Sequence, residues 1–208
     1  MKRLVIGTTN RGKVRQVVGA LASVEGLVCV PIDLVCEDLP LVEEVGASAE
    51  DVAAVKAVAY STAIGQPVLS LDHWLYFPEA SVDDQPLARV RRIPGHDDSR
   101  ADDEQVIAYY SRLCDRYGGR LTAQWHLGIA YAERAKVRTM TVITRRRLVP
   151  EPSPTRMPGL PLSALQVDLD TGRYISEHEA EDERSLWQRV YGPSFANFVT
   201  DCVGHGRS

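Results

Sequence analysis

Two lysines and two carboxylates near the start of the chain are the residues best suited to chemistry. Lys13 and Lys56 are two of only four lysines in the sequence, and Glu44 and Asp72 lie in the same stretch. Mg²⁺ prefers hard oxygen ligands and is usually bound by one or two carboxylates together with substrate phosphates. Lysine ammonium groups offset the negative charge of a transferred phosphoryl group. These residue types therefore predict a site for a phosphorylated ligand and Mg²⁺.

The first elements of the chain should position Lys13. An apolar run at residues 4–6, a polar turn and an amphipathic stretch to residue 21 predict a short strand, a turn and a helix. Backbone N–H groups and the positive end of the dipole favour an anion at such a helix start, where Thr8 and Asn10 add polar side chains. The spacing fits neither G-x-x-x-x-G-K-[ST] nor G-x-G-x-x-G. An ordinary polar turn remains the alternative.

A second helix and strand should position Lys56 and Asp72. Ser48 is a suitable N-cap for a helix over residues 49–64, with Lys56 at the border of its apolar stripe. Residues 68–71 are apolar apart from one serine and predict a buried strand that ends at Asp72, where open α/β sheets place functional side chains. The stripe expected to be buried consists of Val52, Val55, Ala59 and Ala63.

The remaining pattern completes an α/β arrangement. Residues 77–102 are rich in Pro, Asp and Arg and predict a surface segment, for which a lid is one role. Five prolines in residues 150–161 exclude regular structure there. The periodicity predicts a helix over 103–117, strands over 121–131, 137–144 and 165–169, and helices over 180–190 and 194–203 separated by Gly192-Pro193.

Composition limits the class of protein. At 208 residues with 44% hydrophobic residues, the chain fits one globular domain. A net charge of −4 gives no reason to expect polymeric nucleic acid or an anionic membrane as a partner. The four cysteines lack metal-ligand spacing and are expected to be reduced thiols. Since no apolar run suggests a signal peptide or a membrane span, we expect a cytoplasmic protein.

The order and spacing of these groups resemble the inosine triphosphate pyrophosphatase family, whose members remove non-standard purine nucleotides. The family pattern T-x-N-x-G-K is matched by residues 8–13, and E-E-x-G by residues 43–46 ahead of the helix with Lys56. The strand pattern P-x-x-x-D-D-S-G-L aligns without a gap with residues 67–75. The resemblance is close over residues 1–75 and weak after residue 132.

The resemblance implies a single domain over residues 1–208. Its fold would be α/β, a two-lobed mixed sheet with flanking helices and the triphosphate in a cleft between the lobes, usually in a homodimer. Water would attack the α-phosphate of a nucleoside triphosphate and release the monophosphate and pyrophosphate. By position, the triphosphate would be held by Thr8, Asn10, Lys13 and Lys56. Glu44 would bind Mg²⁺, and Asp72 would bind the metal or activate water.

Several departures from the family pattern lie next to Asp72. Leu71 replaces the first aspartate of D-D-S-G-L, and His73 and Trp74 replace its serine and glycine. His73 has a reference pKa suited to a base, or it is a structural or solvated histidine. Trp74 either borders the substrate in place of the glycine or is part of the core. His73 and Trp74 are both candidate substrate contacts.

The second half of the chain lacks the family's base-reading segments, G-F-G-[YW]-D-P and S-H-R-G. Discrimination by hydrogen bonds to a 6-keto purine therefore has no visible basis. The first hypothesis is a Mg²⁺-dependent nucleoside triphosphate pyrophosphatase with altered base specificity. The alternative is a catalytically impaired or repurposed member that binds a nucleotide or another phosphorylated ligand.

Overall fold

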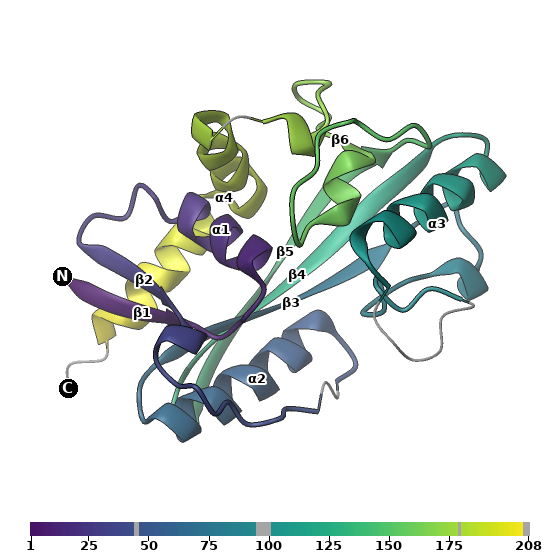
Figure 1. Cartoon of the computed structure of the whole chain (residues 1–208). Helices are drawn as coiled ribbons and strands as arrows, with labels where there is room; N and C mark the ends of the chain where they lie inside the picture. Colours follow the sequence, from purple (N-terminus) through teal and green to yellow (C-terminus); the bar gives the residue numbers. More distant parts are fainter. Residues whose placement is uncertain (44–45, 95–100, 179, 206–208) are drawn as a thin grey trace. The chain divides into compact units, whose positions relative to one another are not determined.

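The computed structural model describes residues 1–43, 46–94, 101–178 and 180–205 and shows an α/β fold (Figure 1). Its six-stranded sheet has the order β2-β1-β3-β4-β5-β6. Strand β1 pairs in parallel with β2 and β3, whereas β5 and β6 are antiparallel. The mixed sheet with flanking helices confirms the predicted fold class. The strands are β1 Lys2–Ile6, β2 Leu27–Pro31, β3 Val68–Tyr76, β4 Leu121–Glu133, β5 Lys136–Leu148 and β6 Gln166–Val167, and the α-helices are α1 Arg11–Ala20, α2 Ala49–Ile64, α3 Asp103–Arg116 and α4 Ala180–His205.

The chain divides into two compact units. The first comprises Met1–His73, Leu127–Val142 and Glu181–Ser208, and it contains β1, β2, α1, α2 and nearly all of α4. The second comprises Trp74–His126 and Ile143–Ala180, and it contains α3, β6 and the short 3-10 helices η2 Val82–Asp84, η3 Pro161–Ala164 and η4 Ile175–Glu177.

Helix α2 has the predicted bounds but buries a different face. Val52 is buried as expected, whereas Val55 and Ala63 are exposed. The buried stripe follows small residues at four-residue spacing, and Ala53 and Ala57 pack against Ala130 and Ala132 of β4. Small side chains let the helix approach the strand closely, and this contact outweighs the larger apolar side chain of Val55. The full set of buried α2 residues is Ala49, Val52, Ala53, Ala57 and Ser61.

The closest approach of α2 to β4 depends on Gly128. A Cβ atom at Gly128 would lie 2.1 Å from the backbone carbon of Ala49. Because that neighbour is backbone in the first turn of α2, it cannot move aside cheaply. We expect Gly128→Ala to lower the free energy of unfolding by about 3 kcal/mol, measured by urea denaturation. Gly204→Ala is the control, since its Cβ would meet nothing within 4 Å. Equal stability of the two variants would contradict the close packing.

Strand β3 is longer than predicted, so Asp72 does not end it. The strand runs from Val68 to Tyr76 because the aromatic and branched residues after Asp72 continue the extended chain. The parallel partner β1 does stop early, since its last pairs are Val5 with Val68 and Ile6 with Leu69. Asp72 therefore lies in the middle of β3 but beyond the end of the neighbouring strand.

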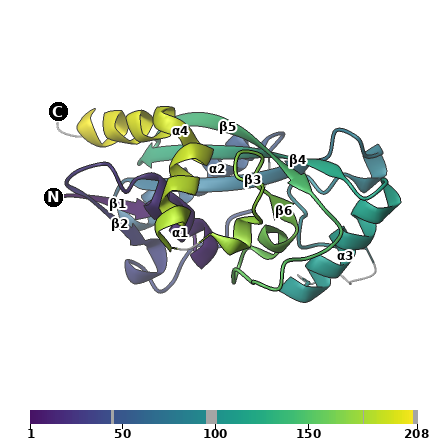
Figure 2. The same cartoon turned by 90° about the horizontal axis from the view of Figure 1, so that it is seen from above.

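Helix α4 consists of two helical segments, as the sequence predicts. Gly192 has φ of 70° and ψ of 170°, which is outside helical geometry, and Pro193 follows it. The bend is visible in the olive-to-yellow helix of Figure 2. The first segment packs on α1, where a Cβ at Gly19 would lie 2.9 Å from the ring of Trp187. Trp187 is buried at this contact.

The second unit has its core between α3 and the strands. Helix α3 confirms the predicted helix, and its buried residues recur at helical spacing: Val106, Ile107, Tyr110, Leu113 and Cys114. A capping box between Asp102 and Gln105 starts this helix and was not anticipated from the sequence. The expected surface segment 77–102 contributes Phe77 and Ile93 to the same core. Those parts of it are thus packed, and residues 95–100 lie outside the described residues.

The other predicted elements are present with shifted ends. Strands β4 and β5 are longer than the strands predicted over 121–131 and 137–144 and are neighbours in the sheet, and β6 is shorter than the predicted strand 165–169. All four cysteines are free thiols, and burial raises the pKa of Cys29 to about 11. Among the described residues, none of the helices is long and apolar enough to span a membrane.

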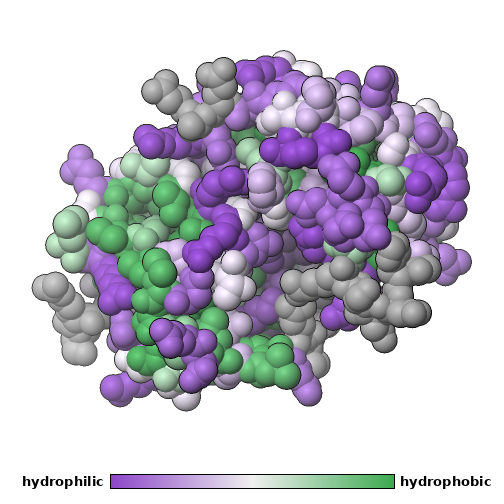
Figure 3. All heavy atoms as spheres, viewed as in Figure 1, coloured by the Kyte–Doolittle hydropathy of each residue, from purple (hydrophilic) through white to green (hydrophobic). Residues whose placement is uncertain are grey.

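The segment that follows β2 is mostly irregular. After the 3-10 helix η1 Ile32–Leu34, the described residues up to 43 form no further helix or strand. Leu34 and Leu41 are exposed, and hydrophobic atoms gather on this part of the face shown in Figure 3.

Candidate active site

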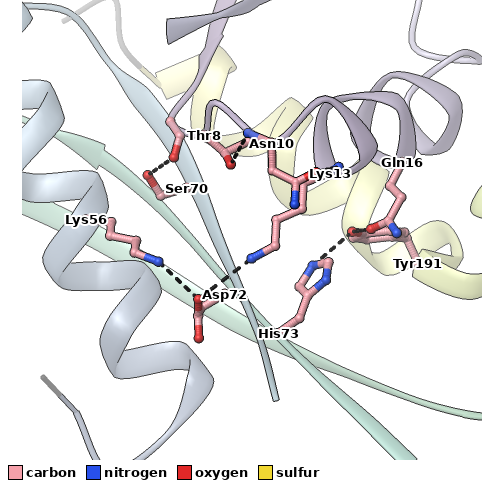
Figure 4. Close-up of polar contacts among 10 residues, drawn as sticks. Thr8, Asn10, Lys13, Gln16, Lys56, Ser70, Asp72, His73 and Tyr191 are labelled. Carbon is pink, nitrogen blue, oxygen red and sulfur yellow. Dashed lines mark hydrogen bonds and ion pairs between the residues drawn. The ribbon is translucent and has the colours of Figure 1, made fainter. Parts of the chain in front are cut away.

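Three of the predicted site residues meet in the first unit. Lys56 Nζ lies 3.1 Å from Asp72 Oδ1, and Lys13 Nζ lies 3.7 Å from the same oxygen. All three side chains are largely buried, with exposed fractions of 12% for Lys56, 19% for Lys13 and 9% for Asp72. Figure 4 shows the two ammonium groups pointing toward the carboxylate from opposite directions. Residues distant in sequence thus form one charged cluster.

Two features explain why the two lysines come from different helices: the alternation of side chains along β3 and the early end of β1. Successive side chains of a strand point to opposite faces of the sheet. Ser70 lies near the α2 side, since a Cβ at Gly7 would contact both Ser70 Oγ and the ring of Tyr60. Asp72, two residues on, reaches Lys56 of α2. Lys13 reaches the same carboxylate from α1 because β1 has already ended.

The cluster brings two ammonium groups to one oxygen of a carboxylate. Partial burial weakens the screening that water would provide. Phosphate oxygens are suited to accept hydrogen bonds from lysine ammonium groups of this kind. The cluster is therefore a candidate phosphate site.

The turn before α1 differs from the expectation that its backbone N–H groups are open to an anion. Asn10 is the N-cap, and its Oδ1 accepts hydrogen bonds from the backbone N–H groups of Gly12 and Lys13 at 2.8 and 3.2 Å. Thr8 Oγ1 accepts a hydrogen bond from the backbone N–H of Asn10 at 3.2 Å. These contacts stabilise the helix start. In this arrangement Thr8 and Asn10 orient Lys13, and the Asn10 amide group remains chemically able to donate to a phosphate.

His73 and Trp74 are assigned to different units, and the contacts described next are those of His73. Both are half-buried, and Trp74 belongs to the second unit. His73 faces away from Lys56: its Nε2 lies 3.5 Å from the hydroxyl of Tyr191 in α4. That hydroxyl also donates to Gln16 Oε1 of α1 at 3.2 Å. Neither Gln16 nor Tyr191 was predicted from the sequence, and only the spacing of Gln16 three residues after Lys13 could have suggested the first.

The described carboxylates form no preassembled metal cluster. No group of three or more His, Cys, Asp or Glu residues is close enough to hold a metal ion in the part of the chain that the structure describes. Glu44, the other expected ligand, lies outside the described residues. Asp72 is a hard oxygen donor beside the proposed phosphate site, and one carboxylate together with substrate phosphates is a usual set of ligands for Mg²⁺. The residues present thus fit a metal that arrives with its phosphorylated ligand.

Comparisons with known proteins identify relatives of the chain. It is 34% identical over 124 residues to a protein of Symbiobacterium thermophilum named dITP/XTP pyrophosphatase, covering 60% of this chain and 58% of that protein. The chain thus spans less than two thirds of the length of that relative. A Deinococcus radiodurans protein with the same name is 31% identical over 144 residues, covering 60% of this chain and 68% of that protein.

Solved structures share the fold. The structure of a HAM1 protein from Coxiella burnetii has a TM-score of 0.73 and 18% identity, covering 97% of this chain and 100% of that chain. A family model described as the Ham1 family matches residues 4–158, further along the sequence than the motifs alone indicated. Since this match includes most of the chain, and with it Asn10, both site lysines and Asp72, the protein belongs to the Ham1 family.

Proposed function

We propose that this protein is a Mg²⁺-dependent nucleoside triphosphate pyrophosphatase that converts a nucleoside triphosphate and water to the monophosphate and pyrophosphate. The observation that carries the proposal is the convergence of Lys13 and Lys56 on Asp72 Oδ1. Membership of the Ham1 family and the pyrophosphatase names of two relatives support the same reaction.

The residues of the site have separate roles in the proposed reaction. Lys13 and Lys56 bind phosphate oxygens from the α1 and α2 sides and stabilise the negative charge that develops in the transition state. Asp72 holds both ammonium groups in place before the substrate binds and then orients or deprotonates the attacking water. Asn10 fixes the first turn of α1 and thereby the position of Lys13.

Mg²⁺ belongs to the proposal as a cofactor. When bound, it supplies positive charge to the phosphate oxygens. Among the described residues near the phosphate site, Asp72 is the one that would hold it, and Glu44 is the second ligand expected from the family pattern. Activity that persists unchanged in EDTA would remove the metal from the proposal.

Altered base specificity is the second part of the proposal. Two relatives are named for dITP and XTP, yet this chain lacks the base-reading segments of the family pattern in its second half. We therefore expect a substrate range different from that of these relatives. A panel of standard, deaminated and modified nucleotides, assayed for pyrophosphate release with Mg²⁺, tests the proposal. Turnover of none of them would contradict enzymatic activity.

Each site lysine should contribute separately to phosphate binding. We expect Lys13→Met and Lys56→Met each to weaken binding of inorganic triphosphate by about tenfold or more, because each removes a charge-assisted hydrogen bond to phosphate. Isothermal calorimetry measures the change. Lys136→Met is the matched control, since Lys136 is an exposed lysine of the same unit. An equal effect at Lys136 would indicate only a general charge effect.

A binding protein without catalysis is the second candidate. It is favoured by Leu71, which replaces a family carboxylate and is only 1% exposed. Calorimetry that shows nucleotide binding while the whole panel remains unhydrolysed would favour this candidate. Turnover abolished by a change at Asp72 would exclude it.

A further inference from the structure

We infer that Arg145 binds a small oxyanion, a phosphate or a carboxylate, and that Gln124 and His126 are positioning residues that hold its guanidinium group. The three side chains form a continuous row of hydrogen bonds across β4 and β5, which are neighbouring strands of the sheet. All three residues belong to the second unit. The inference does not depend on the proposed pyrophosphatase activity, whose lysines and carboxylate belong to the first unit.

Three consecutive arginines of β5 are divided between the two faces of the strand. Successive side chains of a strand point to opposite faces. Arg146 is 9% exposed and donates from Nη1 to Gln166 Oε1 at 2.9 Å. Leu148, two residues further on, is part of the core of the second unit. Arg145 and Arg147 are exposed and therefore lie on the face of β5 that is turned away from this core.

The contacts of Arg145 determine the orientation of each group in the row. Arg145 Nε donates to Gln124 Oε1 at 2.9 Å, and a guanidinium group has only donors, so the amide oxygen must face it. The amide nitrogen of Gln124 then faces His126 Nε2 at 2.9 Å and donates to it. Because Nε2 is the acceptor, the His126 ring is neutral and has its hydrogen on Nδ1. The exposed arginine is thus held by two half-buried side chains.

The edge of the Arg145 guanidinium formed by Nη1 and Nη2 is suited to an oxyanion. Arginine binds phosphate and carboxylate groups through two parallel hydrogen bonds of this kind. Within the described ranges of the chain, neither Arg145 nor Arg147 forms an ion pair with a carboxylate. Glu79, an acidic residue that contacts β4, accepts hydrogen bonds from Thr122. Holding the guanidinium in advance also lowers the entropic cost of binding a ligand.

Side-chain ¹⁵N–¹H spectra test the inference at the site itself, with inorganic phosphate and acetate as separate probes. We expect a saturable shift of the Arg145 Nε–H signal, which is assigned by its absence from Arg145→Lys. A shift with only one of the two anions would support the inference and identify the preferred group. Phosphate bound at Lys13 and Lys56 is distinguished by the absence of this shift. If neither anion gives a saturable shift, the inference is overturned.

Two variants separate an oriented arginine from a general charge effect. We expect Gln124→Met to raise the anion concentration at half-saturation about tenfold, because the guanidinium is no longer held. Arg147→Met is the matched control and should change it by less than about twofold. Arg147 has the same charge on the same face of β5, but it forms no side-chain hydrogen bond among the described residues. Equal losses in the two variants would overturn the inference.

The role of His126 is tested by loss and rescue. His126→Leu should weaken anion binding about fivefold, and His126→Gln should restore it, because the glutamine oxygen can accept the Gln124 N–H in place of Nε2. In a Gln124→Met background, His126→Leu should have no further effect. A merely structural role would give the same loss in both His126 variants and in both backgrounds. Long-range ¹⁵N–¹H spectra should show the Nδ1–H tautomer of His126, and an Nε2–H tautomer would overturn the assigned positioning role.

Discussion

Asp72→Asn is expected to lower nucleoside triphosphate turnover by at least about 100-fold. The amide keeps the shape of the side chain but carries no negative charge and cannot accept the proton of the attacking water. It also removes the counter-charge that both Lys13 and Lys56 approach. Steady-state assays of pyrophosphate release with Mg²⁺ measure the effect.

Binding should respond in the opposite direction, which separates chemistry from a loss of structure. Without metal, Asp72→Asn removes a negative charge next to a polyanion, so we expect inorganic triphosphate to bind as tightly as before or more tightly. Asp33→Asn is the matched control, because Asp33 pairs at 2.5 Å with Arg11, whose side chain is 63% exposed. Wild-type turnover in Asp72→Asn would contradict the assigned role of this carboxylate.

Leu71→Asp is expected to destabilise the protein by about 4 kcal/mol, although it restores the residue of the family pattern. Leu71 is 1% exposed, and a carboxylate there would lose its hydration. Urea denaturation measures the loss of stability. The single substitution should therefore not recover a second metal-binding carboxylate.

Two further variants define the cause of that effect. Leu41→Asp places the same charge at a leucine that is 98% exposed, and we expect no measurable loss of stability. Leu71→Met keeps an apolar side chain of similar volume and should cost less than about 1.5 kcal/mol. A stable Leu71→Asp variant with raised turnover would instead show that position 71 still accepts a catalytic carboxylate.

The site was predictable to the extent that residue type and order determined it. Lysines are rare in this chain, and Lys13 and Lys56 stand at the spacing of a known family pattern, so the residues of the proposed phosphate site could be named in advance. The structure brings both of them to Asp72. The roles assigned to Thr8, Asn10, His73 and Trp74 as substrate contacts remain predictions.

Helix bounds were more predictable than buried faces. Ser48 and Gly65 mark the two ends of α2 in the sequence, and the structure has the N-cap and the left-handed C-cap at these residues. The buried face was wrong because apolar size favoured Val55, whereas close approach to Gly128 and the alanines of β4 selected smaller residues. Local capping chemistry is encoded near each end, but the partner that a face meets lies far away in the sequence.

By itself, the sequence determined the fold class, the family resemblance and the charged groups that a polyphosphate site requires. Only the tertiary structure decided that Asp72 lies within β3 rather than at its end, and that β1 stops early enough for lysines of two helices to reach one carboxylate oxygen. It alone placed Tyr191 against His73, across 118 residues of chain. The physical reason is that periodicity and capping act over a few residues, whereas strand pairing and side-chain convergence depend on contacts between distant segments.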